Sequence, residues 1–128
     1  AIAIALRAKR GPGRIFLVTD AMATIGTDMP EFTLNGRTIR REGGRLTLAD
    51  GTLAGADLDM ISAVRFMHRE IGLPREEALR MASLYPAQAV GQEHRLGRIG
   101  AGRPASFVHL SDELDVRGVW IDGERVQG

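Results

Sequence analysis

The sequence lacks several features that would assign it to a special class. It contains no cysteine, which excludes disulfide bonds and thiolate metal sites. No apolar run approaches the length of a membrane span. The formal net charge is only +1, so the charge balance gives no reason to expect nucleic acid or an anionic membrane as a partner. With 128 residues, of which 44% are hydrophobic, the chain is expected to form one small domain at most.

The first ten residues, AIAIALRAKR, predict a helix of strong helix formers. Arg7, Lys9 and Arg10 lie where cations suit the negative helix end, and residues 11–13, Gly-Pro-Gly, stop the helix. Because the charges follow the apolar residues, the segment does not have the pattern of a signal peptide. We interpret it as the end of a helix that belongs to a longer protein.

A continuous apolar run at residues 15–18 follows and ends at Asp20. An apolar run without alternation is typical of a strand that is buried on both faces, as in a parallel α/β sheet or barrel. An acid at the tip of such a strand either anchors a loop or does chemistry at the mouth of a pocket, and the pattern alone favours the anchor. The segment after it contains the small residues Ala21, Ala23 and Gly26.

Residues 31–48 predict two or three short antiparallel strands, because Asn35-Gly36 and Gly43-Gly44 are strong turn signals. Two helices are expected next, one from about Asp57 and one that Pro74 opens. The tail predicts short strands again, with a turn at Asp122-Gly123. An isolated hairpin is marginal in water, so the two β regions are expected to pair with each other or with strands outside this chain.

Five stretches of this sequence, taken in order, match a known family: LVTDAMA, LADGTLAGA, ASLYPAQAVG, LGRIGAGRPASFVHL and VWIDGERV. They resemble the C-terminal part of the N-acetylglucosamine-6-phosphate deacetylases, which belong to the amidohydrolase superfamily. The first two stretches are fairly specific to these deacetylases, whereas the tail pattern is common to many amidohydrolases. The resemblance extends over nearly all of the chain from Arg14 onward.

The resemblance implies an α/β fold, the C-terminal part of a TIM-like (β/α)8 amidohydrolase barrel plus part of a small β-sandwich. Residues 1–30 would be the end of the barrel, with residues 15–19 as its eighth strand and a catalytic loop. Residues 31–56 would be a β-hairpin insert with a substrate loop, residues 57–93 the closing helices, and residues 94–128 strands of the sandwich. TIM-barrel catalytic residues collect at the C-terminal ends of the strands, where Asp20 would then lie.

The resemblance also implies the chemistry, which is hydrolysis of the acetamide of N-acetylglucosamine 6-phosphate to glucosamine 6-phosphate and acetate. In this family the aspartate that corresponds to Asp20 is the acid/base that acts on a metal-activated water. Leu53, Ala54 and Gly55 would lie against the sugar and contribute backbone contacts. Ala56 stands where the family usually has serine, so one hydroxyl is lost.

The implied cofactor is a divalent metal ion, zinc or iron, whose ligands are a glutamate and two histidines on earlier barrel strands. The three histidines here, His68, His94 and His109, lack metal-ligand spacing, so we predict no metal ligand in this chain and no activity for this chain alone. The resemblance further implies an amino-sugar phosphate as the partner, a homodimer and a cytoplasmic location. Two alternatives remain open: an amidohydrolase with a different amide or cyclic substrate, and a non-catalytic α+β binding module.

Overall fold

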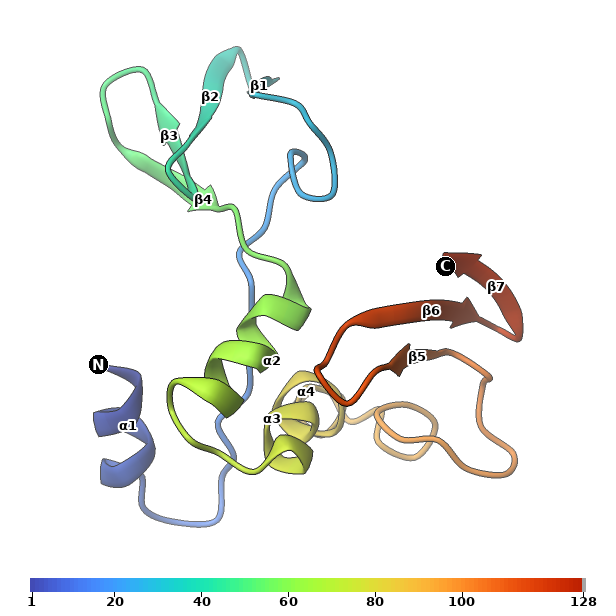
Figure 1. The fold of residues 1–128 in the computed structure, drawn as a ribbon. Helices are drawn as coiled ribbons and strands as arrows, with labels where there is room; N and C mark the ends of the chain where they lie inside the picture. Colours follow the sequence, from blue (N-terminus) through green and yellow to red (C-terminus); the bar gives the residue numbers. More distant parts are fainter. Residues whose placement is uncertain (128) are drawn as a thin grey trace. The chain divides into compact units, whose positions relative to one another are not determined.

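The computed structural model describes residues 1–127, which form a mixed α/β chain with two small antiparallel sheets (Figure 1). The chain divides into two compact units, one of Ala1–Leu17 with the residues from Val64 onward, the other of Val18–Ala63. The helices are α1 (Ile2–Ala8), α2 (Met60–Arg69), α3 (Arg75–Ala82) and α4 (Leu84–Ala89). The strands are β1 (Glu31–Leu34), β2 (Arg37–Glu42), β3 (Arg45–Leu48), β4 (Leu53–Ala56), β5 (Phe107–Leu110), β6 (Val116–Ile121) and β7 (Glu124–Gln127).

The unit Val18–Ala63 contains a four-stranded meander in the order β1-β2-β3-β4. Asn35 and Gly36 both have positive φ, at 51° and 74°, which confirms the tight turn predicted between the first two strands. The turn predicted at residues 43–44 is also formed. Ile39 and Leu46 are the buried apolar residues of this sheet, with exposed fractions of 3% and 0%. The sheet has one strand more than the sequence predicted, because the segment expected to be a substrate loop forms β4.

The other unit packs its helices around a small apolar core. Val64 and Met67 of α2 and Ala78 and Met81 of α3 are buried. Pro74 is the N-cap residue of α3, and its carbonyl accepts hydrogen bonds from two amides of the first turn. The prediction that Pro74 occupies the first helical position is therefore wrong by one residue.

A half-buried acid joins α3 to α4. The Tyr85 hydroxyl donates to Glu77 Oε1 and Oε2 at 2.8 and 2.9 Å, and Arg80 Nε donates to Oε2 at 3.0 Å. Burial favours the neutral acid, but these donors outweigh it, so the pKa of Glu77 is lowered below its ordinary value. The charged carboxylate is therefore part of what holds the two helices together at neutral pH.

The second sheet, in the order β5-β6-β7, belongs to the same unit as α3 and α4. Phe107 and Trp120 stack with ring centroids 4.9 Å apart, and the predicted turn at Asp122-Gly123 is formed, with φ of 49° and 89°. Neither sheet contains a strand of the other. Of the two expected arrangements, pairing of the β regions with each other is therefore wrong for the described residues, and pairing with strands outside this chain stays a prediction.

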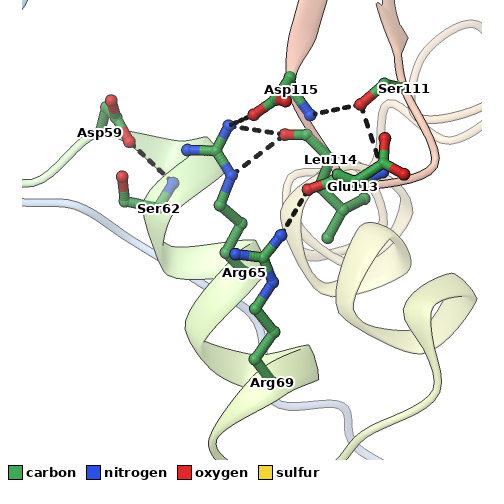
Figure 2. A network of polar contacts seen from close by, with 8 residues as sticks. All are labelled: Asp59, Ser62, Arg65, Arg69, Ser111, Glu113, Leu114 and Asp115. Carbon is green, nitrogen blue, oxygen red and sulfur yellow. Dashed lines mark hydrogen bonds and ion pairs between the residues drawn. The ribbon is translucent and has the colours of Figure 1, made fainter.

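The loop between β5 and β6 is fixed to α2 by two arginines (Figure 2). Arg65 Nη2 donates to the Leu114 carbonyl at 2.8 Å and to Asp115 Oδ1 at 2.9 Å, and Arg69 Nη2 donates to the Glu113 carbonyl at 2.6 Å. Ser111 Oγ accepts hydrogen bonds from two amides of the loop. Leu114 has a φ of 66° and is only 1% exposed. Its strained backbone is therefore stabilised by the hydrogen bonds of the two arginines and by burial of the leucine side chain.

The strand predicted at residues 15–19 is not formed in the described chain. The Leu17 amide donates one backbone hydrogen bond, to the Met81 carbonyl at 2.9 Å, but no neighbouring strand continues the pairing. Phe16 and Val18, expected to be buried, are 40% and 71% exposed. The physical reason is that a parallel strand needs a hydrogen-bonded neighbour and cover on both faces, which residues 1–127 do not provide.

No helix among these residues is both long and apolar enough to cross a membrane.

Candidate active site

Asp20 lies in an unusual backbone conformation with its side chain free. Its φ is 54°, the left-handed region that few residues other than glycine, asparagine and aspartate adopt. Its side chain is exposed, and its carboxylate has no hydrogen bond or ion pair within residues 1–127. The interpretation as a loop anchor, which the sequence pattern alone favoured, requires such a bond. A strained residue whose side chain makes no stabilising contact is a candidate for function.

Strand β4 runs directly beside this aspartate. The Ala56 amide donates to the Asp20 carbonyl at 3.0 Å, and Ala21 and Ala56 form a parallel bridge. Gly55 is buried so closely that a Cβ atom there would lie 2.8 Å from Met22 Sδ and 3.1 Å from the Asp20 carbonyl oxygen. A larger residue here would displace the Met22 side chain and push against the Asp20 carbonyl, so glycine favours this close approach. The structure thus brings together Asp20 and Leu53–Gly55, the residues that sequence reasoning selected separately.

The chain after Asp20 folds into a compact turn. The Ile25 amide donates to the Met22 carbonyl at 3.1 Å, and both the amide and the hydroxyl of Thr27 donate to the Thr24 carbonyl, at 3.1 and 2.9 Å. Thr24 is completely buried, and its hydroxyl has no hydrogen-bond partner within the described residues. The turn is therefore ordered by its own hydrogen bonds and by burial of one polar side chain.

Four arginines of the hairpins, Arg37, Arg40, Arg41 and Arg45, stand close together in the sequence. Their mixture with acidic residues predicts a solvated hairpin face in preference to a phosphate site, and for Arg41 this prediction is wrong. Arg41 Nε donates to Asp57 Oδ2 at 2.7 Å and Nη1 donates to the Thr27 carbonyl at 2.6 Å. The signal that could have found it is the period of two along β2, because Arg41 lies on the same sheet face as the buried Ile39. Register confirms the placement, since Arg41 is directly opposite the buried Leu46.

The other residues considered for chemistry are structural or exposed. Arg37 and Arg40 form exposed ion pairs, at 3.9 Å to Asp50 and 3.5 Å to Glu31, as expected for a solvated hairpin face. His68 Nδ1 lies 2.8 Å from the Leu73 carbonyl oxygen, and the other two histidines are exposed. Within residues 1–127 no three His, Asp or Glu side chains are grouped so that they could hold a metal ion. The described residues therefore do not fit a catalytic metal site.

The amidohydrolase family model matches residues 7–126, so this chain belongs to the amidohydrolase family. Members of this family generally depend on a metal ion. Three curated relatives make the resemblance more specific. The chain is 41% identical over 122 residues to the N-acetylgalactosamine-6-phosphate deacetylase of Shewanella sp. (strain ANA-3). It is 40% identical over 111 residues to a putative N-acetylgalactosamine-6-phosphate deacetylase of Escherichia coli (strain K12), and 39% identical over 127 residues to the N-acetylglucosamine-6-phosphate deacetylase of Bos taurus.

Solved structures of deacetylases share the fold of this chain. The N-acetylglucosamine-6-phosphate deacetylase of Pasteurella multocida matches with a TM-score of 0.81 at 36% identity, over 88% of this chain and 30% of that one. A mutant of the Mycobacterium smegmatis N-acetyl-D-glucosamine-6-phosphate deacetylase, in complex with N-acetyl-D-glucosamine-6-phosphate, matches with a TM-score of 0.78 at 32% identity, over 92% and 32%.

The matches cover most of this chain and a smaller part of each relative. They extend over 95%, 87% and 98% of this chain for the Shewanella, E. coli and bovine relatives, in that order. The chain spans 31% of the length of the Shewanella and bovine relatives and 66% of the E. coli one.

Proposed function

We propose that this chain supplies part of the active site of a deacetylase that hydrolyses the acetamide of an N-acetylated amino-sugar 6-phosphate, releasing acetate and the free amine. The observation that carries the proposal is the juxtaposition of an exposed, unpartnered and strained carboxylate at Asp20 with strand β4. The deacetylase names of its relatives support the choice of reaction.

In this proposal Asp20 transfers a proton. Its carboxylate accepts a proton from the water that attacks the acetamide carbonyl carbon, and then donates it to the departing nitrogen as the C–N bond breaks. A backbone held in one conformation keeps the carboxylate at a fixed place beside the bound amide. The residues Leu53, Ala54 and Gly55 would lie along the sugar, and Ala56 offers no hydroxyl there.

Other parts of the site would come from outside the described residues. No ligand set for a metal is present within residues 1–127, so we propose that a divalent ion, zinc or iron, is bound elsewhere in the full-length protein, and that this chain alone is inactive. We also propose that residues 15–19 join a TIM-like barrel as a strand and that the full-length protein has a small β-sandwich. The proposed regions are the end of the barrel (1–30), the hairpin insert (31–56), the closing helices (57–93) and the sandwich strands (94–128). A dimer and a cytoplasmic location complete the proposal.

The configuration of the sugar gives a second candidate substrate. The Shewanella and E. coli relatives, at 40–41% identity, are named for N-acetylgalactosamine 6-phosphate, whereas relatives at 33–39% identity are named for N-acetylglucosamine 6-phosphate. The two sugars differ only in the orientation of the 4-hydroxyl group. A site that hydrogen-bonds this hydroxyl in one orientation discriminates strongly against the other.

The test is acetate release by the full-length protein that contains these residues. We expect turnover of at least one of the two sugar phosphates after the protein is loaded in turn with zinc and with iron, and a preference of about tenfold or more between the epimers. The matched control is the same pair of sugars without the acetyl group, which should give no acetate. Absence of acetate release from both substrates with either metal would overturn the proposal and favour another amide or cyclic substrate.

A further inference from the structure

Arg41 makes three contacts that join separate parts of the unit Val18–Ala63. Its amide donates to the Pro30 carbonyl at 2.7 Å, its Nη1 donates to the Thr27 carbonyl at 2.6 Å, and its Nε donates to Asp57 Oδ2 at 2.7 Å. Thr27 and Pro30 belong to the segment that follows Asp20. Arg41 therefore binds the end of the Asp20 loop on one side and the residue after β4 on the other.

These contacts close a ring around the candidate site. Asp20 is bonded to Ala56 through its carbonyl, and Asp57 is the next residue along the chain. Asp57 is paired with Arg41, and Arg41 holds Thr27, which the turn of residues 22–27 links back to Asp20. Between Asp57 and Thr27, the link in this ring is a single guanidinium group.

The ion pair is partly withdrawn from water, unlike its neighbours on the hairpins. The side chains of Arg41 and Asp57 are 31% and 12% exposed, whereas those of Arg40 and Glu31 are 66% and 53% exposed. Removing one partner from a desolvated pair leaves an uncompensated charge, and removing an exposed pair changes little. Asp57 Oδ1 already lacks a partner within the described residues, so Arg41 is the main compensation of this carboxylate.

We propose that Arg41 is a positioning residue for the deacetylation reaction, fixing the loop that carries Asp20 against strand β4. The expected effect on catalysis rests on the proposed function, whereas the expected effect on hydrogen exchange rests only on the ring of contacts. The role requires two donors on one planar group, one for the Asp57 carboxylate and one for the Thr27 carbonyl. Lysine has its donors on a single nitrogen at the end of a flexible stem, so it does not reproduce the fixed spacing of Nε and Nη1.

The structural test is hydrogen–deuterium exchange on the full-length protein with the variant Arg41→Gln. We expect the amides of Ile25, Thr27 and Ala56 to exchange about tenfold faster, because the ring is opened. The matched control is Arg40→Gln, on the same strand but on the opposite face, and its rates should equal those of the wild type. Equal rates in Arg41→Gln and Arg40→Gln would overturn the proposal.

The catalytic test follows kcat and KM separately in the same variants. Arg41→Gln should lower kcat/KM about 100-fold, since a displacement of about 1 Å between a catalytic group and the substrate has an effect of this size. Arg41→Lys should recover part of this loss, and Arg40→Gln should remain within about twofold of the wild type. Unchanged kcat/KM in Arg41→Gln, in spite of faster exchange, would overturn the positioning role. A wild-type protein without deacetylase activity would instead refute the proposed function, and the exchange test would still decide on the ring.

A second variant covers the case in which Arg41→Gln does not fold. Asp57→Asn keeps the size of the side chain and removes its charge, and it leaves the bond from Arg41 to Thr27 in place. We expect faster exchange at Ala56 and little change at Thr27, because only the β4 side of the ring is released. Wild-type exchange at Ala56 in Asp57→Asn would overturn the proposal.

Discussion

Two loops of the molecule each contain a residue with a left-handed backbone and are each bound by arginine, but they differ in whether that residue's side chain is buried. The loop of residues 111–115 contains Leu114 with a φ of 66°, and the loop after residue 19 contains Asp20 with a φ of 54°. Each is held by arginine side chains that bind backbone carbonyls and a carboxylate. Leu114 is buried, with an exposed fraction of 1%, whereas the Asp20 side chain is exposed and unpartnered within the described residues.

The difference shows what each strained residue is for. Burial of the leucine side chain offsets the cost of its left-handed backbone, so Leu114 contributes to folding. The Asp20 side chain offers no comparable compensation, and its loop is held by other residues. A strained conformation that stability does not explain is expected where a reactive group must be presented in a fixed direction. The comparison therefore predicts that substitution of the two residues affects different properties.

The largest effect is expected for Asp20→Asn in the full-length protein. Asparagine tolerates the left-handed region and has nearly the same shape, so the free energy of unfolding should change by less than about 0.5 kcal/mol. Loss of the proton-transferring carboxylate should lower kcat by about 10²- to 10⁴-fold, while the metal content of the protein stays the same. The matched control is Asp28→Asn, an exposed acid of the same segment, which should retain full activity. Near-normal turnover in Asp20→Asn would remove this residue from the mechanism.

A smaller effect, and on stability instead of catalysis, is expected for Leu114→Ala. Truncation of a fully buried leucine should lower the free energy of unfolding by about 3 kcal/mol, measured by urea unfolding of the full-length protein. Leu96→Ala, at a leucine of the same unit that is 37% exposed, should cost less than about 1 kcal/mol. Equal costs for the two variants would mean that Arg65 and Arg69 alone hold the loop, and the contrast with Asp20 would then lose its basis.

The sequence predicts best where one or two residues decide the local geometry. The turns at Asn35-Gly36 and Asp122-Gly123 were identified because these pairs favour positive φ, and the structure has them. The apolar run at residues 15–18 predicted a strand, but a strand also needs a partner, and that depends on residues elsewhere. The left-handed conformation of Leu114 could not be predicted for the same reason, because it depends on contacts with residues far away in the chain.

In the candidate site too, residues marked by a local pattern were predicted, and a pair of residues far apart in the sequence was not. Asp20 and Leu53–Gly55 were selected from a resemblance of local stretches, and the structure places them side by side. The pair Arg41–Asp57 was missed because its partners are 16 residues apart and the arginine stands among other arginines. Local composition then suggested a solvated face, whereas the alternation with Ile39 would have placed the side chain inward.

The smallest effect is expected for Thr24→Val, which tests whether burial also orders the loop after Asp20. Thr24 is completely buried, and its hydroxyl has no partner within residues 1–127. Replacing this hydroxyl by a methyl group of similar shape should leave the free energy of unfolding unchanged or raise it by up to about 1 kcal/mol, because the cost of desolvating the hydroxyl disappears. Thr24→Ser, the control, keeps the hydroxyl and loses the methyl group, and should cost about 1 kcal/mol. If Thr24→Val were the more destabilising of the two, the hydroxyl would have a partner in the full-length protein, and the Asp20 loop would be held by polar bonds alone.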